Sequence, residues 1–195
     1  MAKTLEFLFD FGSPTTYLAH KRLPGVAERT GAAIIYVPML LGAVFKATGN
    51  ASPAMVPAKG RWMGADMARF ARRHGIEFHS NPYFPINTLH LMRGATGLLD
   101  DIRFAAYVEA VFDAMWREPR NLGEPAELVP VLARAGLSPE EFQALTARDD
   151  VKDRLKTTTE QAVARGAFGA PTFFVGEEMF FGQDRLDFVE EALAA

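Results

Sequence analysis

Strand-like segments occur only at the two ends of this 195-residue chain, and a long helical block separates them. Near the start, Thr4 to Phe11 alternates apolar and acidic side chains, and Ala33 to Val37 forms a second apolar run after a helix. Near the end, Thr172 to Val175 and Met179 to Phe181 flank a glycine-containing turn, which indicates a hairpin. Because short strands and lone hairpins are marginally stable, the two ends must pair with each other in one sheet.

The segments between and beside these strands show helical signals. Ser13-Pro14 is a strong helix start and Gly31 a stop, while Ser138-Pro139-Glu140-Glu141 is a capping box. In the helix from 101 to 116 the apolar residues lie on one stripe. The expected helices are 14–30, 61–74, 88–99, 101–116, 124–135, 138–146, 149–165 and 184–194.

Two further segments carry helix-breaking residues. Pro24-Gly25 falls inside the first helix and is expected to kink or interrupt it, since proline removes a backbone donor. From Pro38 to Lys59 the chain is rich in small residues and proline without a clean period, so we expect a long ordered loop.

The order of elements indicates an α/β thioredoxin-like fold that is interrupted by a large all-helical insertion. We assign residues 1–44 and 155–195 to the thioredoxin-like domain and residues 45–154 to the inserted helical domain.

Composition excludes several classes of function. The formal net charge is −3 with both signs interspersed, so we expect no nucleic-acid partner. No stretch approaches the roughly 20 apolar residues of a membrane span, and the start of the chain shows no leader, so we expect a soluble, cytoplasmic protein. The chain has no cysteine, and its four histidines lack ligand spacing, so we expect no metal. Any sulfur chemistry must use a bound thiol.

Two short motifs carry chemistry. Phe9 to Pro14 delivers the Ser13 hydroxyl to the start of a helix, where free amides and the helix dipole would stabilise a thiolate. Phe168 to Thr172 places Pro171 directly before a strand, and a cis bond there would free the preceding backbone to pair with an extended peptide. The simpler readings are that Ser13 only caps the helix and that Pro171 is trans.

Five motifs together resemble the 2-hydroxychromene-2-carboxylate isomerases and kappa-class glutathione transferases, within the DsbA-like part of the thioredoxin superfamily. They cover nearly the whole chain, in order and with suitable spacing. The motifs are Phe9-Asp10-Phe11-Gly12-Ser13-Pro14, Lys46-Ala47-Thr48-Gly49-Asn50, Pro57-Ala58-Lys59-Gly60, Gly169-Ala170-Pro171-Thr172 and Phe181-Gly182-Gln183-Asp184-Arg185.

The resemblance implies that glutathione is the cofactor and that Ser13 holds its sulfur as a thiolate. It also implies that Lys59 meets a glutathione carboxylate, that the Ala170 backbone meets the cysteinyl part, and that Asp184 meets the γ-glutamyl ammonium. Without the resemblance, the local sequence favours a solvent-exposed Lys59, an Asn50 that is simply a loop residue, and an Asp184 that caps a helix. The implied glutathione-binding residues are Ser13, Asn50, Lys59, Ala170, Pro171, Phe181, Gly182, Gln183 and Asp184.

On the substrate side the resemblance implies Lys46, and Tyr83 and Phe84 as aromatic neighbours of the substrate, although aromatic residues beside prolines are often plain packing. The implied reaction interconverts 2-hydroxychromene-2-carboxylate and trans-o-hydroxybenzylidenepyruvate, or close analogues, in aromatic catabolism. Ala54-Met55-Val56 stands where polar side chains are expected, which leaves the identity of the acid open.

Two alternatives share the scaffold. One is a kappa-class transferase or peroxidase, which uses the same glutathione site but consumes glutathione. The other is a non-catalytic DsbA-like peptide-binding protein. The resemblance also implies a homodimer.

Overall fold

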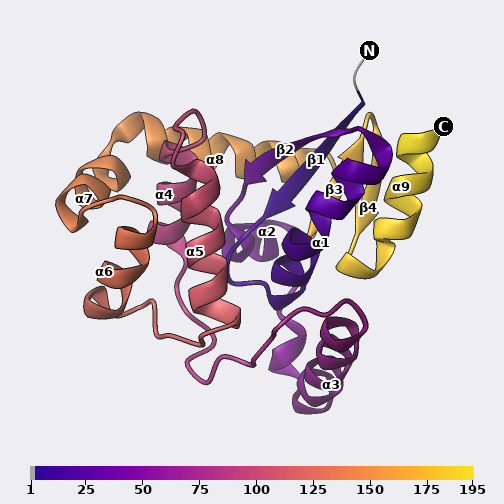
Figure 1. Cartoon of the computed structure of the whole chain (residues 1–195), viewed down its shortest axis with the longest axis horizontal. Coiled ribbons are helices and arrows are strands. Elements are labelled where there is room, and N and C mark those ends of the chain that lie inside the picture. The colour runs from indigo at the N-terminus through magenta and orange to yellow at the C-terminus, as the bar shows by residue number, and fades with distance from the viewer. Residues whose placement is uncertain (1–2) are drawn as a thin grey trace.

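The computed structural model describes residues 3–195 and contains a four-stranded sheet with helices on both faces (Figure 1). The strand order is β2-β1-β3-β4, with β1 parallel to β2 and β3 antiparallel to both of its neighbours. The two ends of the chain therefore share one sheet, which confirms the expected split α/β arrangement. The strands are β1 (Thr4–Phe9), β2 (Ala33–Pro38), β3 (Thr172–Val175) and β4 (Glu178–Phe181).

Helices make up most of the remaining described chain. In Figure 1, α4 to α7 form a lobe beside the sheet, and α3 lies below it. The helices are α1 (Pro14–Thr30), α2 (Leu41–Thr48), α3 (Pro57–Arg73), α4 (Leu89–Gly97), α5 (Phe104–Trp116), α6 (Pro125–Arg134), α7 (Pro139–Ala147), α8 (Asp149–Ala164) and α9 (Leu186–Ala194), with 3₁₀ turns η1 (Pro53–Met55) and η2 (Gln183–Arg185).

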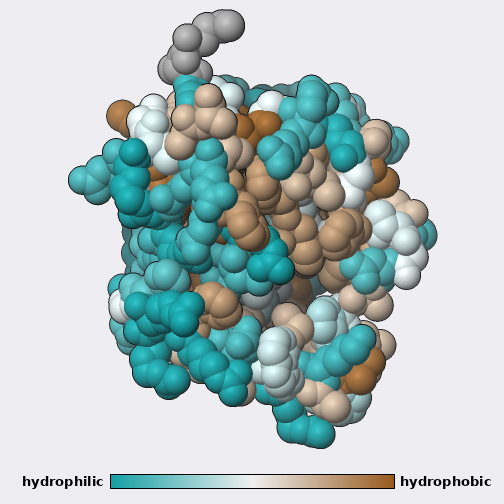
Figure 2. Space-filling view, turned by 90° about the vertical axis from the view of Figure 1, so that its right-hand side faces the viewer, coloured by the Kyte–Doolittle hydropathy of each residue, from teal (hydrophilic) through white to brown (hydrophobic). Residues whose placement is uncertain are grey.

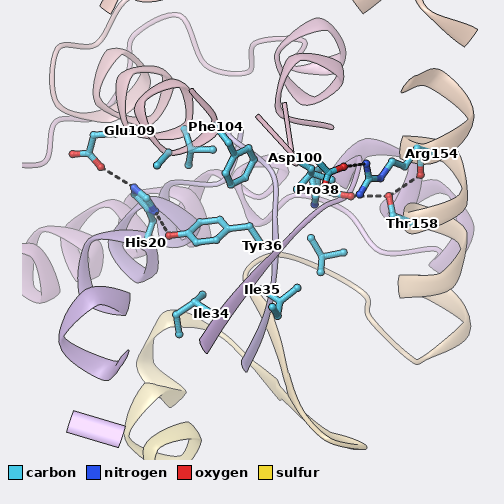
Figure 3. Close-up of a pocket in the computed structure, with 14 residues that line it drawn as sticks. His20, Ile34, Ile35, Tyr36, Pro38, Asp100, Phe104, Glu109, Arg154 and Thr158 are labelled. Carbon is cyan, nitrogen blue, oxygen red and sulfur yellow. Dashed lines mark hydrogen bonds and ion pairs between the residues drawn. The ribbon is translucent and has the colours of Figure 1, made fainter. Parts of the chain in front are cut away.

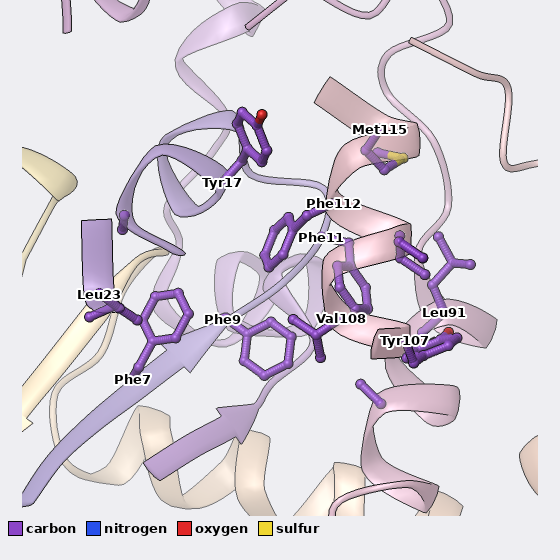
Figure 4. Packing of buried hydrophobic residues seen from close by; sticks show 14 of the residues in the cluster. Phe7, Phe9, Phe11, Tyr17, Leu23, Leu91, Tyr107, Val108, Phe112 and Met115 are labelled. Carbon is purple, nitrogen blue, oxygen red and sulfur yellow. Dashed lines mark hydrogen bonds between the residues drawn. The ribbon is translucent and has the colours of Figure 1, made fainter. Parts of the chain in front are cut away.

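The central strand β1 buries both of its faces. Phe7 stacks on Phe173 of β3, and Phe9 packs with Phe112 of α5, whose ring centroid lies 6.0 Å from that of Phe9 (Figure 4). On the other face, Leu8 packs with Val44 of α2 and with Ala162 of α8. A fully buried central strand explains why Leu8 breaks the alternation of apolar and polar residues.

The expected long loop from Pro38 to Lys59 is wrong. The segment contains α2, then η1, and its last residues begin α3 at Pro57 rather than at 61. Helix α2 is short, ends at Gly49 with a positive φ of 70°, and buries only Val44. A helix of eight residues with a single buried side chain has no apolar periodicity that the sequence could reveal. Its formation therefore depends on its packing against α8.

Helix α1 is continuous through Pro24, so the expected interruption does not occur. The helix begins at the Ser13 cap and ends at Gly31, whose φ of 68° and hydrogen bond to the Ala27 carbonyl form the C-cap. The expected capping box of α7 is confirmed in both directions between Ser138 and Glu141.

The predicted domain junctions, 44/45 and 154/155, fall inside α2 and α8. We keep the division into a thioredoxin-like part and a helical insertion as a proposal. Among residues 3–195 the structure has no helix with both the length and the apolarity that crossing a bilayer requires.

Figure 2 shows the molecule from the side of α9, with helix α3 and its flanking turns, here called the α3 lobe, at the bottom. Apolar residues form a broad patch on this face, and the surface is indented where the α3 lobe meets the body. Exposed aromatic side chains on these two helices include Trp62 of α3 and Phe188 of α9. The first turn of α1 begins at the end of the sheet that lies toward α3 (Figure 1).

Candidate active site

Ser13 sits at the junction between β1 and α1. Its amide donates to the Asp10 carbonyl at 3.1 Å, which turns the chain out of the strand. Its Oγ accepts from the Thr16 amide at 3.2 Å, and Pro14 occupies the first helical position without needing a donor. Ser13 therefore does cap α1, and the residue as a whole is only 4% exposed.

The Ser13 hydroxyl also contacts the predicted motif around Pro171. Ser13 Oγ donates to the Ala170 carbonyl at 3.0 Å, across 157 positions of sequence. The Ala170–Pro171 peptide bond is cis, and both residues are buried. The structure thus joins the helix N-terminus to the backbone that precedes β3.

Thr15 is a third member of this group, and the sequence reasoning missed it. Its Oγ1 lies 3.0 Å from Ser13 Oγ and donates to the Ala170 carbonyl at 3.3 Å. The only sequence signal is a hydroxyl two positions after the cap, in the first helical turn. Two hydroxyls and one carbonyl consequently form a compact polar triangle at the start of α1.

Asp10, which the sequence places in the first strand and in the first family motif without a role of its own, organises the backbone beneath Ser13. Its carboxylate accepts from the Gly12 amide at 2.8 Å, the Leu41 amide at 2.8 Å and the Thr88 hydroxyl at 2.7 Å. Burial raises the pKa of Asp10 above its ordinary value, while these three hydrogen bonds act in the opposite direction. The carboxylate thereby ties the β1–α1 loop to the starts of α2 and α4.

Several predicted glutathione residues surround the cis peptide. The Asn50 side-chain amide donates to the Phe168 carbonyl at 2.8 Å, just before Ala170. The Gly182 amide donates to the Pro171 carbonyl at 3.0 Å. The rings of Phe168 and Phe181 lie 4.5 Å apart between centroids. These residues shape the loop around Ala170 and Pro171.

Gln183 and Asp184 follow at the start of η2. Gln183 is buried, and Arg22 of α1 donates to its carbonyl at 2.6 Å and to its Oε1 at 3.2 Å. Asp184 is exposed and pairs with Arg185 at 2.6 Å. Gly182 has a φ of 103°, and an added Cβ would lie 2.5 Å from Asp184 Oδ1, so this turn requires glycine.

Within residues 3–195, no hydrogen bond or ion pair joins the remaining four predicted residues to Ser13, Thr15 or Ala170. Lys46 is exposed in the last turn of α2, and Lys59 is exposed in the first turn of α3. Tyr83 is 54% exposed, whereas Phe84 packs on Trp116 with 6.0 Å between ring centroids. Trp116 in turn donates to the Phe11 carbonyl at 2.8 Å, so Phe84 is only indirectly connected to the loop before Ser13.

A separate cavity of about 780 Å³ runs along β2, between α5 and α8 (Figure 3). At one end His20 Nδ1 lies 3.0 Å from the Tyr36 hydroxyl and Nε2 lies 2.9 Å from Glu109 Oε2. The hydrogen bond from His20, followed by that from Lys21, lowers the pKa of Glu109 to about 2. No predicted site residue lines this cavity, so its size alone does not make it the candidate active site.

Comparison with known proteins defines the class of fold. Residues 4–194 match the DSBA-like thioredoxin domain. A probable DsbA oxidoreductase from Streptomyces coelicolor superposes with a TM-score of 0.74 at 18% identity, over 98% of this chain and 88% of that one. The chain therefore has the DsbA-type thioredoxin-like fold.

Closer relatives identify the family. The 2-hydroxychromene-2-carboxylate isomerase of Pseudomonas putida is 32% identical over 97% of this chain and 93% of its own length. A solved structure of 2-hydroxychromene-2-carboxylate isomerase superposes with a TM-score of 0.88 at 31% identity, over 97% of this chain and 94% of that one. Human glutathione S-transferase kappa 1 is 28% identical over 99% of this chain and 92% of its own length. The chain belongs to the 2-hydroxychromene-2-carboxylate isomerase family of DSBA-like thioredoxin domains.

Proposed function

We propose that this chain is a glutathione-dependent isomerase that interconverts 2-hydroxychromene-2-carboxylate and trans-o-hydroxybenzylidenepyruvate, or a close analogue. The observation that carries the proposal is the buried Ser13 hydroxyl at the start of α1, 3.0 Å from the Ala170 carbonyl that precedes a cis proline. Relatives named as this isomerase, at about one-third identity over nearly the whole chain, support the reaction.

The residues present fit glutathione. Bound glutathione would supply the nucleophilic thiolate that a chain without cysteine lacks. The Ser13 hydroxyl would donate to the sulfur, and the positive end of the α1 dipole would favour the anion. The Ala170 backbone lies beside Ser13 and would pair with the peptide part of the ligand.

The remaining predicted residues would hold the ends of the tripeptide and the substrate. Lys59 is an exposed cation suited to a carboxylate, and Asp184 is an exposed anion suited to an ammonium group. Asn50 would act by ordering the loop at Phe168 that leads to Ala170. Lys46 would provide the cation for the substrate carboxylate.

Ser13→Ala tests the site. We expect isomerisation, followed by ultraviolet absorbance with saturating glutathione, to fall by about 100-fold or more, as when one preorganised donor to an anion is removed. The matched control is Ser138→Ala, which removes the same kind of helix cap from α7. Equal activity in the two variants would contradict the proposal, as would full wild-type activity without glutathione.

A kappa-class transferase or peroxidase is the second candidate, and the 28% identity to human glutathione S-transferase kappa 1 favours it. The two functions differ in the fate of glutathione, because an isomerase regenerates it. Thiol titration during turnover distinguishes them: loss of one thiol per product formed would identify a transferase.

A non-catalytic peptide-binding protein is the third candidate. Glutathione that leaves the melting temperature unchanged would favour it, because a ligand that binds only the folded state raises stability. For the isomerase we further expect a cytoplasmic homodimer, which sedimentation and cell fractionation would test.

A further inference from the structure

We propose that Thr15 is a positioning residue that frees the Ser13 hydroxyl for the glutathione sulfur by maintaining a hydrogen bond to the Ala170 carbonyl. The inference rests on the proposed function and deepens it. It starts from the triangle at the head of α1, in which Ser13 Oγ and Thr15 Oγ1 lie 3.0 Å apart and both donate to one oxygen, at 3.0 and 3.3 Å.

The Ser13 hydroxyl has a single proton. In this structure Ser13 donates it to the Ala170 carbonyl, while its oxygen accepts from the Thr16 amide. A sulfur anion beside Ser13 needs the same proton. When Ser13 turns toward sulfur, the buried Ala170 carbonyl loses a donor, and an unpaired buried carbonyl opposes that turn.

Thr15 supplies the replacement. Its hydroxyl is already within hydrogen-bond distance of the Ala170 carbonyl, so it can keep that acceptor satisfied while Ser13 turns. A carbonyl oxygen has two lone pairs, so a peptide amide of the ligand can bind there at the same time.

The adjacent Thr16 provides a matched control. Its hydroxyl oxygen is buried and has no hydrogen-bond partner among residues 3–195, so it takes no part in the triangle. Thr16→Val removes a hydroxyl from the same helical turn and keeps the shape of the side chain. Thr15→Val makes the same chemical change one position earlier, and Val and Thr have similar helix propensities.

The experiment measures the pKa of the glutathione thiol in the complex, from the ultraviolet absorbance of the thiolate during a pH titration. We expect Thr15→Val and Thr15→Ala to raise it by about 0.5 to 1 pH unit, which corresponds to about 0.7 to 1.4 kcal/mol. Thr15→Ser should restore the wild-type value within about 0.2 unit, since it restores the hydroxyl. Thr16→Val should not change it.

Calorimetric titration with S-methylglutathione, which has no ionisable thiol, provides a second measurement. Its affinity should stay within about twofold of wild type in every variant, whereas glutathione at neutral pH should bind about three- to tenfold more weakly to Thr15→Val. An equal loss for both ligands would overturn the inference, because it would indicate a general packing defect.

The outcomes separate this inference from the proposed function. If the wild-type protein binds no glutathione, both fail. If Ser13→Ala raises the thiol pKa while Thr15→Val behaves like Thr16→Val, the proposed function stands and the role of Thr15 is refuted. Melting curves of each variant establish that the folded protein is being compared.

Discussion

At the scale of single residues, Asp10 shows how one buried carboxylate supports a site that it does not enter. It accepts two backbone amides and one hydroxyl from three different segments, and it lies three positions before Ser13. The precision of the Ser13 position therefore depends on a carboxyl group that is almost completely shielded from water.

Asp10→Asn should destabilise the protein by about 2 kcal/mol. The side-chain amide of asparagine would point its nitrogen either at the Leu41 amide or at the Gly12 amide and the Thr88 hydroxyl. In either orientation two hydrogen-bond donors face each other, and an unsatisfied buried polar group costs about 1–3 kcal/mol. Unfolding in urea measures the change. Asp100→Asn, at a highly exposed side chain, is the control, and an equal change in both would contradict the account.

At the scale of elements, α1 carries two different polar groups on its length. Its first turn holds Ser13 and Thr15 against the loop before β3. One to two turns later, His20 and Lys21 bind Glu109 of α5. The second group joins α1 to α5 beside the cavity along β2 (Figure 3).

Glu109→Gln should cost about 1 kcal/mol near neutral pH, a modest value because the carboxylate is half exposed and screened. Folding lowers the pKa of Glu109 from 4.5 to about 2, chiefly through the His20 hydrogen bond. The ionised Glu109 side chain therefore contributes fully to the free energy of unfolding above pH 4.5, and this contribution disappears as the pH falls toward 2. Urea unfolding at several pH values checks this, and a difference that persists at pH 2 would contradict it.

At the scale of the whole molecule, a buried apolar cluster extends from the sheet into helices α4 to α7. The buried cluster joins Phe7 and Phe9 of β1 with Phe112 of α5 (Figure 4), and it also includes Val131 of α6. The two parts of the chain therefore share their buried surface rather than forming separate cores.

Thermal or urea unfolding should accordingly be one cooperative transition. Far-ultraviolet circular dichroism reports the helices, and the fluorescence of Trp116 and Trp62 reports α5 and α3. The midpoints from the two probes should coincide, as for a two-state domain. Separated midpoints would show that the insertion unfolds as an independent unit.

The sequence determined the elements whose signals are local. The caps at Ser13 and Ser138, the stop at Gly31 and the apolar stripe of α5 were all readable, because capping and helical periodicity depend on neighbouring residues. The pairing of the two chain ends was also readable, since short strands need partners. The family motifs also predict roles in glutathione binding for Ser13 and for the segment around Pro171.

Only the tertiary structure decided the rest. Helix α2 forms where it contacts α8, the Asp10 carboxylate gathers donors from distant segments, and the Thr15 hydroxyl reaches Ala170 across 155 positions. Such contacts join residues far apart in the chain, and no local pattern encodes the distance between them. The candidate site thus follows from a local cap signal, whereas its hydrogen-bond partners follow from long-range packing.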